Sequence, residues 1–455
     1  MILPVWYATM VLLLVAWPLH NLAVALAALR SPREHSPIEQ PELVFWIVIP
    51  ALNEERVISR TVQAALALDA PQTPVRVLVV DDASADATPD ALAAIDDPRL
   101  HVLRRELPDA RRGKGEALNA GYRYVRAQVG EEAAATVLGV IDGDGRASPG
   151  ALRAVSSAFA DPEVCAVQGR VRIHNRETLL GLLQDMEFCC VADASQRLRD
   201  RLGSVGLGGN GQFVRFAVLA DFGDAPWSSC LVEDLELGLR LHLIGYRIRY
   251  RPEMTVTQQG VTDRRRLVRQ RARWAQGNLQ CARYLSGLFG SRQIGSIGLL
   301  DFLQYLIVPW LVVPLSMLVL VVGGTTAAAL ASRVTIPGLV AAPQDAVWAV
   351  SLWIALLALP GLLWATVHRL RYGDEPLRRC LVAGLAYPGF LLLGVLATWL
   401  AMMRYLARRN SWAKTERVTE PRAAGHQLPK DVQPQHRRAS RDAFGHVDPP
   451  AGGET

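Results

Sequence analysis

The sequence has few cysteines, and they lack the spacing that cross-linked or metal-bound cysteines show. The 455 residues include six, and no two of them form a C-x-x-C pair. This pattern argues against a disulfide framework and against a cysteine-based zinc site. Most of the chain is therefore expected in a reducing compartment.

Charge is missing from the start of the chain. The first 29 residues carry no Lys, Arg, Asp or Glu, and Arg30 and Arg33 follow directly. A cleaved signal peptide carries positive charge ahead of its apolar stretch, so an uncleaved anchor is favoured. The apolar run 3–29 exceeds the roughly 20 residues that a span needs. We predict a transmembrane helix at 1–30, with the N-terminus outside and residue 30 onward in the cytoplasm.

Large apolar residues are almost missing from the other end, where 418–455 is polar and contains Pro and Gly. A disordered tail is expected there. The chain as a whole is nevertheless 50% hydrophobic with a positive mean hydropathy. A soluble domain joined to membrane spans has this mixture. The formal net charge of +6 suits a protein beside anionic lipid or one with phosphorylated ligands, and we expect no nucleic-acid partner.

Three more apolar runs follow residue 300, at 302–323, 346–367 and 380–403. The loop 368–379 between the last two holds four arginines and is expected in the cytoplasm. If 380–403 crossed the membrane, Arg404, Arg408 and Arg409 would lie outside. It either crosses or forms a re-entrant or surface-lying segment bent at Pro388. We predict a membrane region at 286–410 with two to three spans and interfacial helices.

Between the two apolar regions, short β-branched runs alternate with helical stretches. Strands are predicted at 44–50, 75–82, 100–105 and 136–142, and helices at 54–68, 86–95 and 114–128. Such alternation indicates an α/β domain with a mostly parallel sheet, here at 41–285. Ligands of these sheets bind beyond the carboxyl ends of the strands, where this sequence places several acids.

The run Ile141-Asp142-Gly143-Asp144-Gly145 puts two carboxylates just after an apolar strand. Asp142 and Asp144 are our candidates to hold Mg²⁺ or Mn²⁺ together with the oxygens of a diphosphate. The alternative is a solvated acidic turn.

Three other segments surround this one in the predicted sheet. Asp81 and Asp82 end a strand and can bind a base or ribose, although Asp82 or Ser84 can instead cap the next helix. The loop from Pro50 to Glu54 can wall a nucleotide pocket, with Asn53 as the expected N-cap of its helix. Lys114 opens a helix after a basic loop, where it can meet phosphate or simply be solvated.

Two helical segments carry further candidates. Glu233 and Asp234 begin an amphipathic helix, and either can act as a general base or merely stabilise the helix dipole. In the basic stretch from Arg264, Arg273 can bind diphosphate and Trp274 can stack on a sugar, or the helix can be a lipid anchor. The glycines at 206, 208 and 211 match a dinucleotide fingerprint without its βαβ context. We expect them to let the backbone pass close to a sugar.

The order of these motifs resembles one family. PALNEE, VVDDAS, RRGKGEALNAG, IDGDG, GGNGQFVR, VEDLELGLRL and QRARW occur in succession, followed by spans. This order is similar to that of the membrane-embedded family-two glycosyltransferases. That group includes cellulose, hyaluronan and poly-N-acetylglucosamine synthases and bacterial glucosyl-diacylglycerol synthases. The resemblance covers roughly 44–280.

The resemblance implies a GT-A, Rossmann-like cytoplasmic domain with flanking transmembrane helices in the plasma (inner) membrane. It implies that donor binding involves Pro50, Glu54, Asp81, Asp82, Lys114, Asp142, Gln270 and Arg273, that Asp142 and Asp144 hold the metal, that Asp234 is the catalytic base, and that Glu233 and Trp274 meet the acceptor. Val232 stands where the family usually has Thr.

The expected function is therefore inverting, metal-dependent transfer from UDP-glucose or UDP-N-acetylglucosamine. Extension of a β-linked polysaccharide is ranked slightly ahead of glycosylation of a membrane lipid such as diacylglycerol. The few predicted spans favour a lipid acceptor or a short product. A membrane-tethered nucleotide-sugar binding protein without turnover is the non-enzyme alternative. Accessory subunits or a homo-oligomer are compatible with all three.

Overall fold

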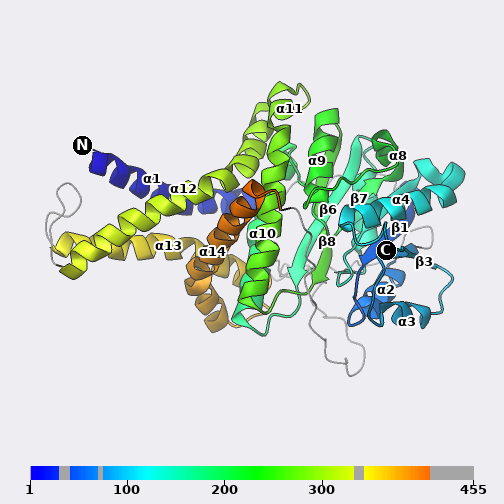
Figure 1. Cartoon of the computed structure of the whole chain (residues 1–455), viewed down its shortest axis with the longest axis horizontal. Helices are drawn as coiled ribbons and strands as arrows, with labels where there is room; N and C mark the ends of the chain where they lie inside the picture. Colours follow the sequence, from blue (N-terminus) through cyan, green and yellow to red (C-terminus); the bar gives the residue numbers. More distant parts are fainter. Residues whose placement is uncertain (1, 30–40, 70–74, 333–342, 410–455) are drawn as a thin grey trace, which may run out of the picture. The chain divides into compact units, whose positions relative to one another are not determined.

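A computed structural model describes residues 2–29, 41–69, 75–332 and 343–409, all within the unit Met1–Glu420. The predicted disordered tail at 418–455 lies outside the described residues. Figure 1 shows the described helices and strands.

One eight-stranded sheet forms the centre of the soluble domain, with the strand order β3-β2-β1-β4-β7-β6-β8-β5. The strands are β1 (Val44–Ala51), β2 (Arg76–Asp81), β3 (Leu100–Arg104), β4 (Thr136–Val140), β5 (Arg146–Ala147), β6 (Val164–Ile173), β7 (Gln212–Arg215) and β8 (Arg247–Gln258).

The helices that matter below are α1 (Ile2–Leu29), α2 (Ile58–Leu66), α3 (Thr88–Ala93), α4 (Lys114–Val129), α5 (Ala151–Phe159), α6 (Leu179–Met186), α7 (Asp193–Leu202), α9 (Glu233–Ile244), α10 (Arg264–Cys281), α11 (Leu285–Gly290), α12 (Ser296–Ser332), α13 (Pro343–Arg371) and α14 (Leu377–Leu406). A π-helical segment, η2 (Glu187–Ala192), joins α6 to α7.

The predicted strands and helices before residue 142 are all present, and the half-sheet β3-β2-β1-β4 is parallel as predicted. Beyond β4 the sheet is mixed, because β7 runs antiparallel to both β4 and β6. The expected α/β, GT-A-like fold is therefore confirmed, but the sheet is mixed rather than mostly parallel.

Alternating side chains of the central strands form two cores, as the two-residue period of a strand requires. Phe45, Ile47 and Ile49 of β1 pack on one face with residues of α2 and α5. Trp46 and Val48 pack on the other face with residues of α4 and α9. Because helices cover both faces of the sheet, a ligand can reach the sheet only at the ends of its strands.

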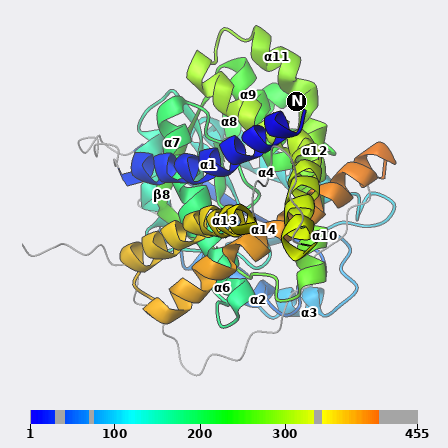
Figure 2. The same cartoon turned by 90° about the vertical axis from the view of Figure 1, so that its left-hand side faces the viewer.

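The apolar segments predicted as spans are helical. Helices α1, α12 and α13 extend together away from the sheet (Figure 1). Two segments among the described residues, Ser296–Thr325 and Leu377–Leu406, are long and apolar enough to cross a membrane. Figure 2 looks toward these helices from the left of Figure 1 and shows α14 running across them.

Candidate active site

The carboxyl ends of β1, β2 and β4 lie side by side at the same end of the sheet. Ala51 at the end of β1 is paired with Asp81 at the end of β2. Val48 of β1 is paired with Val140, the last residue of β4, two positions before Asp142. The topology therefore places Pro50, Asp81 and Asp142 on three adjacent strands at the same edge, as the sequence predicts.

The first acid pair is held by arginines that immediately follow β3 or end it. Asp81 accepts a hydrogen bond from the Ser84 amide at 2.9 Å and pairs with Arg104 at 2.8 Å. Asp82 pairs with Arg105 at 2.5 Å. Burial raises the pKa of Asp82, although the Arg111 amide and Arg105 act in the opposite direction. These arginines were not predicted as part of the site.

The capping alternatives for these loops are wrong. Helix α3 begins at Thr88 and has Ala87 at its N-cap, so neither Asp82 nor Ser84 caps it. Helix α2 has Val57 at its N-cap, so Asn53 does not cap it either. Asn53 instead adopts a positive φ of 53°, and its Oδ1 accepts a hydrogen bond from the Ala85 amide at 2.7 Å. The loops after β1 and β2 are thus tied to each other.

The predicted pocket-wall residue Glu54 is buried between two loops. Its amide donates to Oγ1 of Thr88 at 2.7 Å. Its side chain lies against Gly143, where an added Cβ would approach Glu54 Cγ to 2.9 Å. Glu54 is therefore adjacent to the turn that carries Asp142 and Asp144.

Asp142 and Asp144 are both fixed by polar contacts from later parts of the chain. The Asp142 amide donates to Oδ1 of Asn210 at 3.2 Å. The Asp144 carboxylate is buried and accepts from the Gln259 amide at 2.9 Å. Their carboxylate oxygens form the hard donor set that Mg²⁺ and Mn²⁺ prefer. The pair therefore fits a divalent cation, with Asn210 and Gln259 as supports that were not predicted.

Lys114, the first residue of α4, joins the metal-candidate acids to the base-candidate acids. Its Nζ lies 2.5 Å from Asp142 Oδ1 and 2.7 Å from the Gly209 carbonyl oxygen, to both of which it donates. It also lies 3.8 Å from Glu233 Oε1. Burial alone would lower the pKa of Lys114, but the charges of Asp142, Glu233 and Asp234 outweigh burial and raise it. The ammonium is therefore charged and balances part of this acidic cluster.

Glu233 and Asp234 begin α9 and are adjacent to this lysine. Burial raises the pKa of Glu233 to about 7, and the neighbouring Asp234 adds to the increase. Burial also raises the pKa of Asp234, against the charge of Lys114. A buried carboxylate with a raised pKa is suited to accept a proton near neutral pH. The general-base interpretation of these residues thus has the electrostatic environment that it needs.

Gly209 closes the site from the β7 side. A Cβ at this position would lie 2.7 Å from Lys114 Nζ and 3.1 Å from Asp234 Oδ2. The glycine-rich segment therefore passes close to the charged cluster, and a larger residue would displace the lysine. The expected approach of this segment to a sugar stays a prediction.

Helix α10 carries the remaining candidates, two of which lie near the start of α9. Gln270, Arg273 and Trp274 lie on one side of this helix because they are three and four residues apart. The charge of Arg273 acts on Glu233, and Trp274 packs in the cluster that contains Val232 and Leu235. Gly277 allows this approach, since a Cβ there would lie 2.7 Å from both methyl carbons of Val232.

The π-helical segment η2 supplies two residues that were not predicted. Phe188 packs edge-on against Trp274, with ring centroids 6.2 Å apart. Glu187 forms an ion pair with Arg271, whose guanidinium lies 4.4 Å from the Trp274 ring centroid. Segments of π-helix occur frequently at functional sites. The irregular helix around 187–192 was the missed feature, and no simple periodicity in the sequence indicates it.

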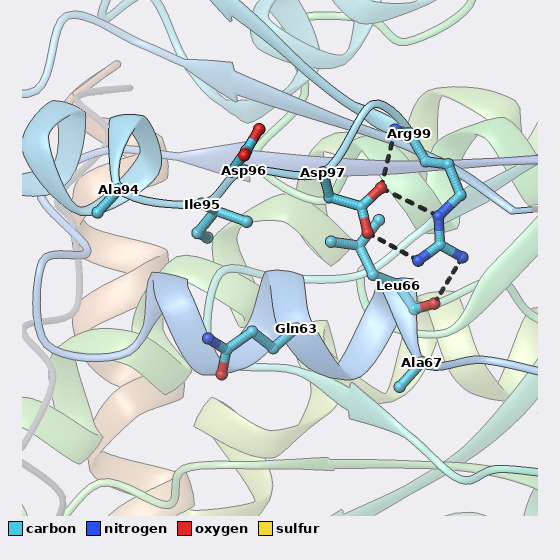
Figure 3. A pocket seen from close by; sticks show the side chains of 8 residues that line it. All are labelled: Gln63, Leu66, Ala67, Ala94, Ile95, Asp96, Asp97 and Arg99. Carbon is cyan, nitrogen blue, oxygen red and sulfur yellow. Dashed lines mark hydrogen bonds and ion pairs between the residues drawn. The ribbon is translucent and has the colours of Figure 1, made fainter.

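A hollow of about 430 Å³ lies elsewhere in the domain (Figure 3). Its lining includes Leu66 at the end of α2 and Arg99 just before β3, so it lies at the amino ends of the strands. Asp97 and Arg99 pair there at 2.8 Å, and Arg99 also donates to the Leu66 carbonyl. Asp97 and Arg99 thus neutralise each other, and none of the predicted site residues lines the hollow.

Another cluster resembles a metal site by composition. Ligand atoms of Asp185, Cys189 and His368 all lie within 4.8 Å of one another. However, Asp185 Oδ2 already accepts from Arg172 at 2.8 Å and from His368 at 3.1 Å. Positively charged groups thus surround this carboxylate, and the cluster is a buried ion-pair network rather than a cation site.

Comparison with known proteins adds the following. The family model described as "Glycosyltransferase like family 2" matches residues 41–277. A β-monoglucosyldiacylglycerol synthase of Trichormus variabilis is 32% identical over 322 residues, which cover 67% of this chain and 65% of the relative. The chain therefore matches slightly less than two thirds of that relative's length.

Two further comparisons differ in what they contribute. A poly-β-1,6-N-acetyl-D-glucosamine synthase of Staphylococcus epidermidis is 26% identical over 251 residues, covering 54% of this chain and 56% of the relative. A solved mannosyltransferase of Pyrobaculum calidifontis, in complex with GDP-mannose and Mn²⁺, matches with a TM-score of 0.59 and 20% identity. That match covers 90% of this chain and 99% of the mannosyltransferase. At this identity it supports the fold alone.

Proposed function

Because this chain belongs to the family-two glycosyltransferases, we propose that it transfers one hexose from a nucleotide-diphosphate donor to a membrane lipid of the diacylglycerol type. UDP-glucose is the first donor to test. The observation that carries the proposal is the cluster of Asp142, Lys114, Glu233 and Asp234. It combines groups for a donor diphosphate with a base for an acceptor hydroxyl.

The proposed roles follow from the contacts. Asp234 accepts the proton of the acceptor hydroxyl, whose oxygen bonds to the anomeric carbon as the bond to the β-phosphate oxygen breaks. Inversion follows from this single displacement. Lys114 donates hydrogen bonds to Asp142 and Gly209 in the structure and is placed to turn toward the diphosphate. Asp142 and Asp144 would hold Mg²⁺ or Mn²⁺, which neutralises charge on the departing diphosphate.

Donor and acceptor are assigned to opposite sides of this cluster. The loops with Pro50, Glu54, Asp81 and Asp82 form the strand-end side and are proposed to bind the nucleoside, with Gln270 and Arg273 at the diphosphate. Glu233 and Trp274 form the acceptor side. Trp274 packs near α12 through the shared cluster with Phe302 and Leu306, which brings the acceptor side beside an apolar helix.

A lipid acceptor is now ranked ahead of polysaccharide extension. The glucolipid synthase matches with higher identity and over more of the chain than the poly-N-acetylglucosamine synthase. This reverses the order expected from the sequence. The catalytic domain is proposed to face the cytoplasm from the plasma membrane, as the arginine distribution indicates.

Thin-layer chromatography of products made from radiolabelled UDP-glucose and diacylglycerol in nanodiscs tests the proposal. We expect one mobile glycolipid that carries a single sugar. Label retained at the origin as a polymer would overturn the lipid assignment. Donor binding without UDP release would support the non-enzyme alternative. A panel with UDP-N-acetylglucosamine and GDP-mannose identifies the donor.

The metal assignment is tested by Asp144→Asn. We expect glycolipid formation to fall by at least about 100-fold, the scale for losing an electrostatic group at developing charge, while the protein stays folded. Asp97→Asn, in the hollow at the amino ends of the strands, is the matched control and should keep its turnover. Near-normal turnover in Asp144→Asn would contradict the assignment.

A further inference from the structure

Helix α14 (Leu377–Leu406) has the length and composition of a membrane span, but both of its ends are bound to the catalytic domain. At its start, Arg379 donates to the carbonyl oxygens of Arg176 at 2.6 Å and Glu177 at 3.1 Å, in the loop between β6 and α6. At its end, Arg404 donates to Gln276 of α10 at 2.9 Å. Gln276 in turn donates to the Arg409 carbonyl at 2.7 Å.

These anchors conflict with a crossing. A helix of 30 residues is about 45 Å long at 1.5 Å per residue, more than the roughly 30 Å hydrocarbon core. If it crossed, its two ends would lie on opposite sides of the bilayer. Both ends instead contact parts of one soluble domain. Figure 1 shows α14 beside α10 and steeply inclined to α12 and α13.

The buried residues of α14 form one continuous side of the helix, which faces the rest of the protein. They are Cys380, Ala383, Gly384, Tyr387, Phe390, Ala397 and Ala401. Near the start, Gly384 meets Gly361 of α13 almost backbone to backbone, since a Cβ on Gly361 would lie 2.1 Å from the Gly384 oxygen. Near the end, Ala397 and Ala401 pack against Ala272 and Leu279 of α10. The helix therefore crosses α13 at a close contact and then follows α10.

The opposite side is an exposed apolar stripe. Leu residues at 377, 381, 385, 392 and 396 and Met403 are between 42% and 62% exposed. They are separated by four or seven residues, so they share one side of the helix. A stripe of this length would be unfavourable against water. Exposed arginines flank it, with Arg378 at the start and Arg408 and Arg409 after the end.

We propose that α14 does not span the membrane but lies in the cytoplasmic leaflet, with the apolar stripe in the acyl chains and its arginines at anionic headgroups. An exposed apolar stripe with arginines at both ends can bind an anionic leaflet in this way, because apolar side chains favour the acyl region and positive charges favour the headgroups. The helix α10, which carries Trp274, would then lie on the same leaflet surface. The arginines after α14 remain in the cytoplasm, which resolves their conflict with the positive-inside rule.

Depth measurements on the full chain in anionic nanodiscs test this topology. Single substitutions Leu377→Cys, Leu392→Cys and Leu406→Cys are spin-labelled, and the parent protein, whose cysteines are buried or half-buried, gives the background. We expect all three labels at similar depth, roughly 5–10 Å below the headgroups. A label at 392 near the bilayer centre, about 15 Å deep, with 377 and 406 at opposite surfaces, would overturn the proposal.

A second readout needs no substitution within the helix. Fusion of green fluorescent protein or alkaline phosphatase to the C-terminus should give fluorescence and no phosphatase activity, because the end of the chain stays in the cytoplasm. The reverse result would overturn the proposal. The proposal would also be overturned if two copies of the Leu392→Cys variant formed a disulfide with each other and the label at 392 showed no contact with lipid. That result would mean that the stripe is a dimer interface. None of these readouts depends on turnover, so they are independent of the proposed reaction.

Discussion

At the scale of single residues, we expect the buried pair Glu233 and Asp234 to have the largest effect on the chemistry of the proposed site. Each carboxyl has a raised pKa because it is buried, and the charge of Asp234 raises the pKa of Glu233 further. An acid with a raised pKa stays protonated to higher pH than usual. Below its pKa the pair holds an extra proton, and the base needed for transfer is less available.

We therefore expect kcat/KM for glycolipid formation to fall as the pH decreases through about 7, the pKa of Glu233. In Glu233→Gln one charge is lost, so Asp234 ionises more easily and the acidic limb should move to lower pH. A full pH profile of kcat/KM, which reports the free enzyme, measures this shift. An unchanged limb in the variant would show that another group titrates.

The residue types of the site were predictable, but their partners were not. The acids at 81, 142 and 144 were predictable because they follow short apolar runs, and parallel strands bring their carboxyl ends to one edge. The contact of Lys114 with Asp142 joins residues that are 28 apart, and that with Gly209 joins residues 95 apart. No local pattern encodes such contacts. Asn53 was misassigned because a polar residue after a strand serves a turn as readily as a cap.

At the scale of elements, the close packing of α10 against the start of α9 depends on one glycine. Gly277 faces Val232, directly before the acids of α9. The methyl groups of Val232 therefore limit how closely α10 can approach the start of α9.

Gly277→Ala should displace α10 and move Arg273 and Trp274 relative to Glu233. We expect at least a roughly tenfold lower kcat and a loss of about 1–3 kcal/mol in stability, as in other overpacked sites. Gly290→Ala is the control, because a Cβ there meets nothing within 4 Å. Adding Val232→Ala should restore part of the activity of Gly277→Ala, and turnover in the double variant measures this. No rescue would mean that the contact does not set the position of α10.

The π-helical segment η2 places a second aromatic ring beside Trp274, on the proposed acceptor side. Phe188→Ala removes the ring that packs edge-on against Trp274. Such a pair contributes about 0.5–1.5 kcal/mol beyond its buried area, so we expect the KM for the lipid acceptor to rise roughly 2- to 12-fold. The KM for the donor should stay unchanged. Phe289→Ala, an exposed ring on α11, is the control. A change in the donor KM instead would place Phe188 at the donor side.

At the scale of the whole described unit, buried ion pairs connect the apolar helix α13 and the loop after it to the catalytic domain. His368 in the last turn of α13 lies beyond the predicted span 346–367 and is fully buried against Asp185. Burial opposes its charge, but the hydrogen bonds to Asp185 and Cys189 outweigh burial and raise the pKa of His368 to about 9. Asp374 joins the same network through Arg172 at 2.9 Å and Arg176 at 2.6 Å.

A raised histidine pKa stabilises the folded state while the ring is charged. This stabilisation is complete below the unfolded value of about 6.5 and is lost as the pH rises through about 9. We expect the unfolding temperature in detergent to fall between about pH 7 and 9.5, and His368→Gln to remove this fall. The variant should also be less stable at neutral pH by about 3–5 kcal/mol, as for other broken buried pairs. His20→Gln, an exposed site on α1, is the control, and an identical pH dependence in His368→Gln would contradict the assignment.

The apolar helices were predictable from composition, whereas the sequence left open whether the last one crosses the membrane or lies on its surface. Hydropathy depends on composition, and α12 and α14 both pass that test. What distinguishes them is that α14 is hydrogen-bonded to the catalytic domain at both ends. Those partners are distant in the sequence, and only the folded chain brings them together.

The ammonium group of Lys114 already supplies positive charge among Asp142, Glu233 and Asp234. The positive charge of Lys114 thus offsets repulsion between these acids, and we expect that folding does not require a bound ion. Chelators should consequently silence catalysis while leaving the melting temperature untouched. In that respect the cation would behave as a co-substrate that arrives with each sugar nucleotide, rather than as a permanent part of the architecture.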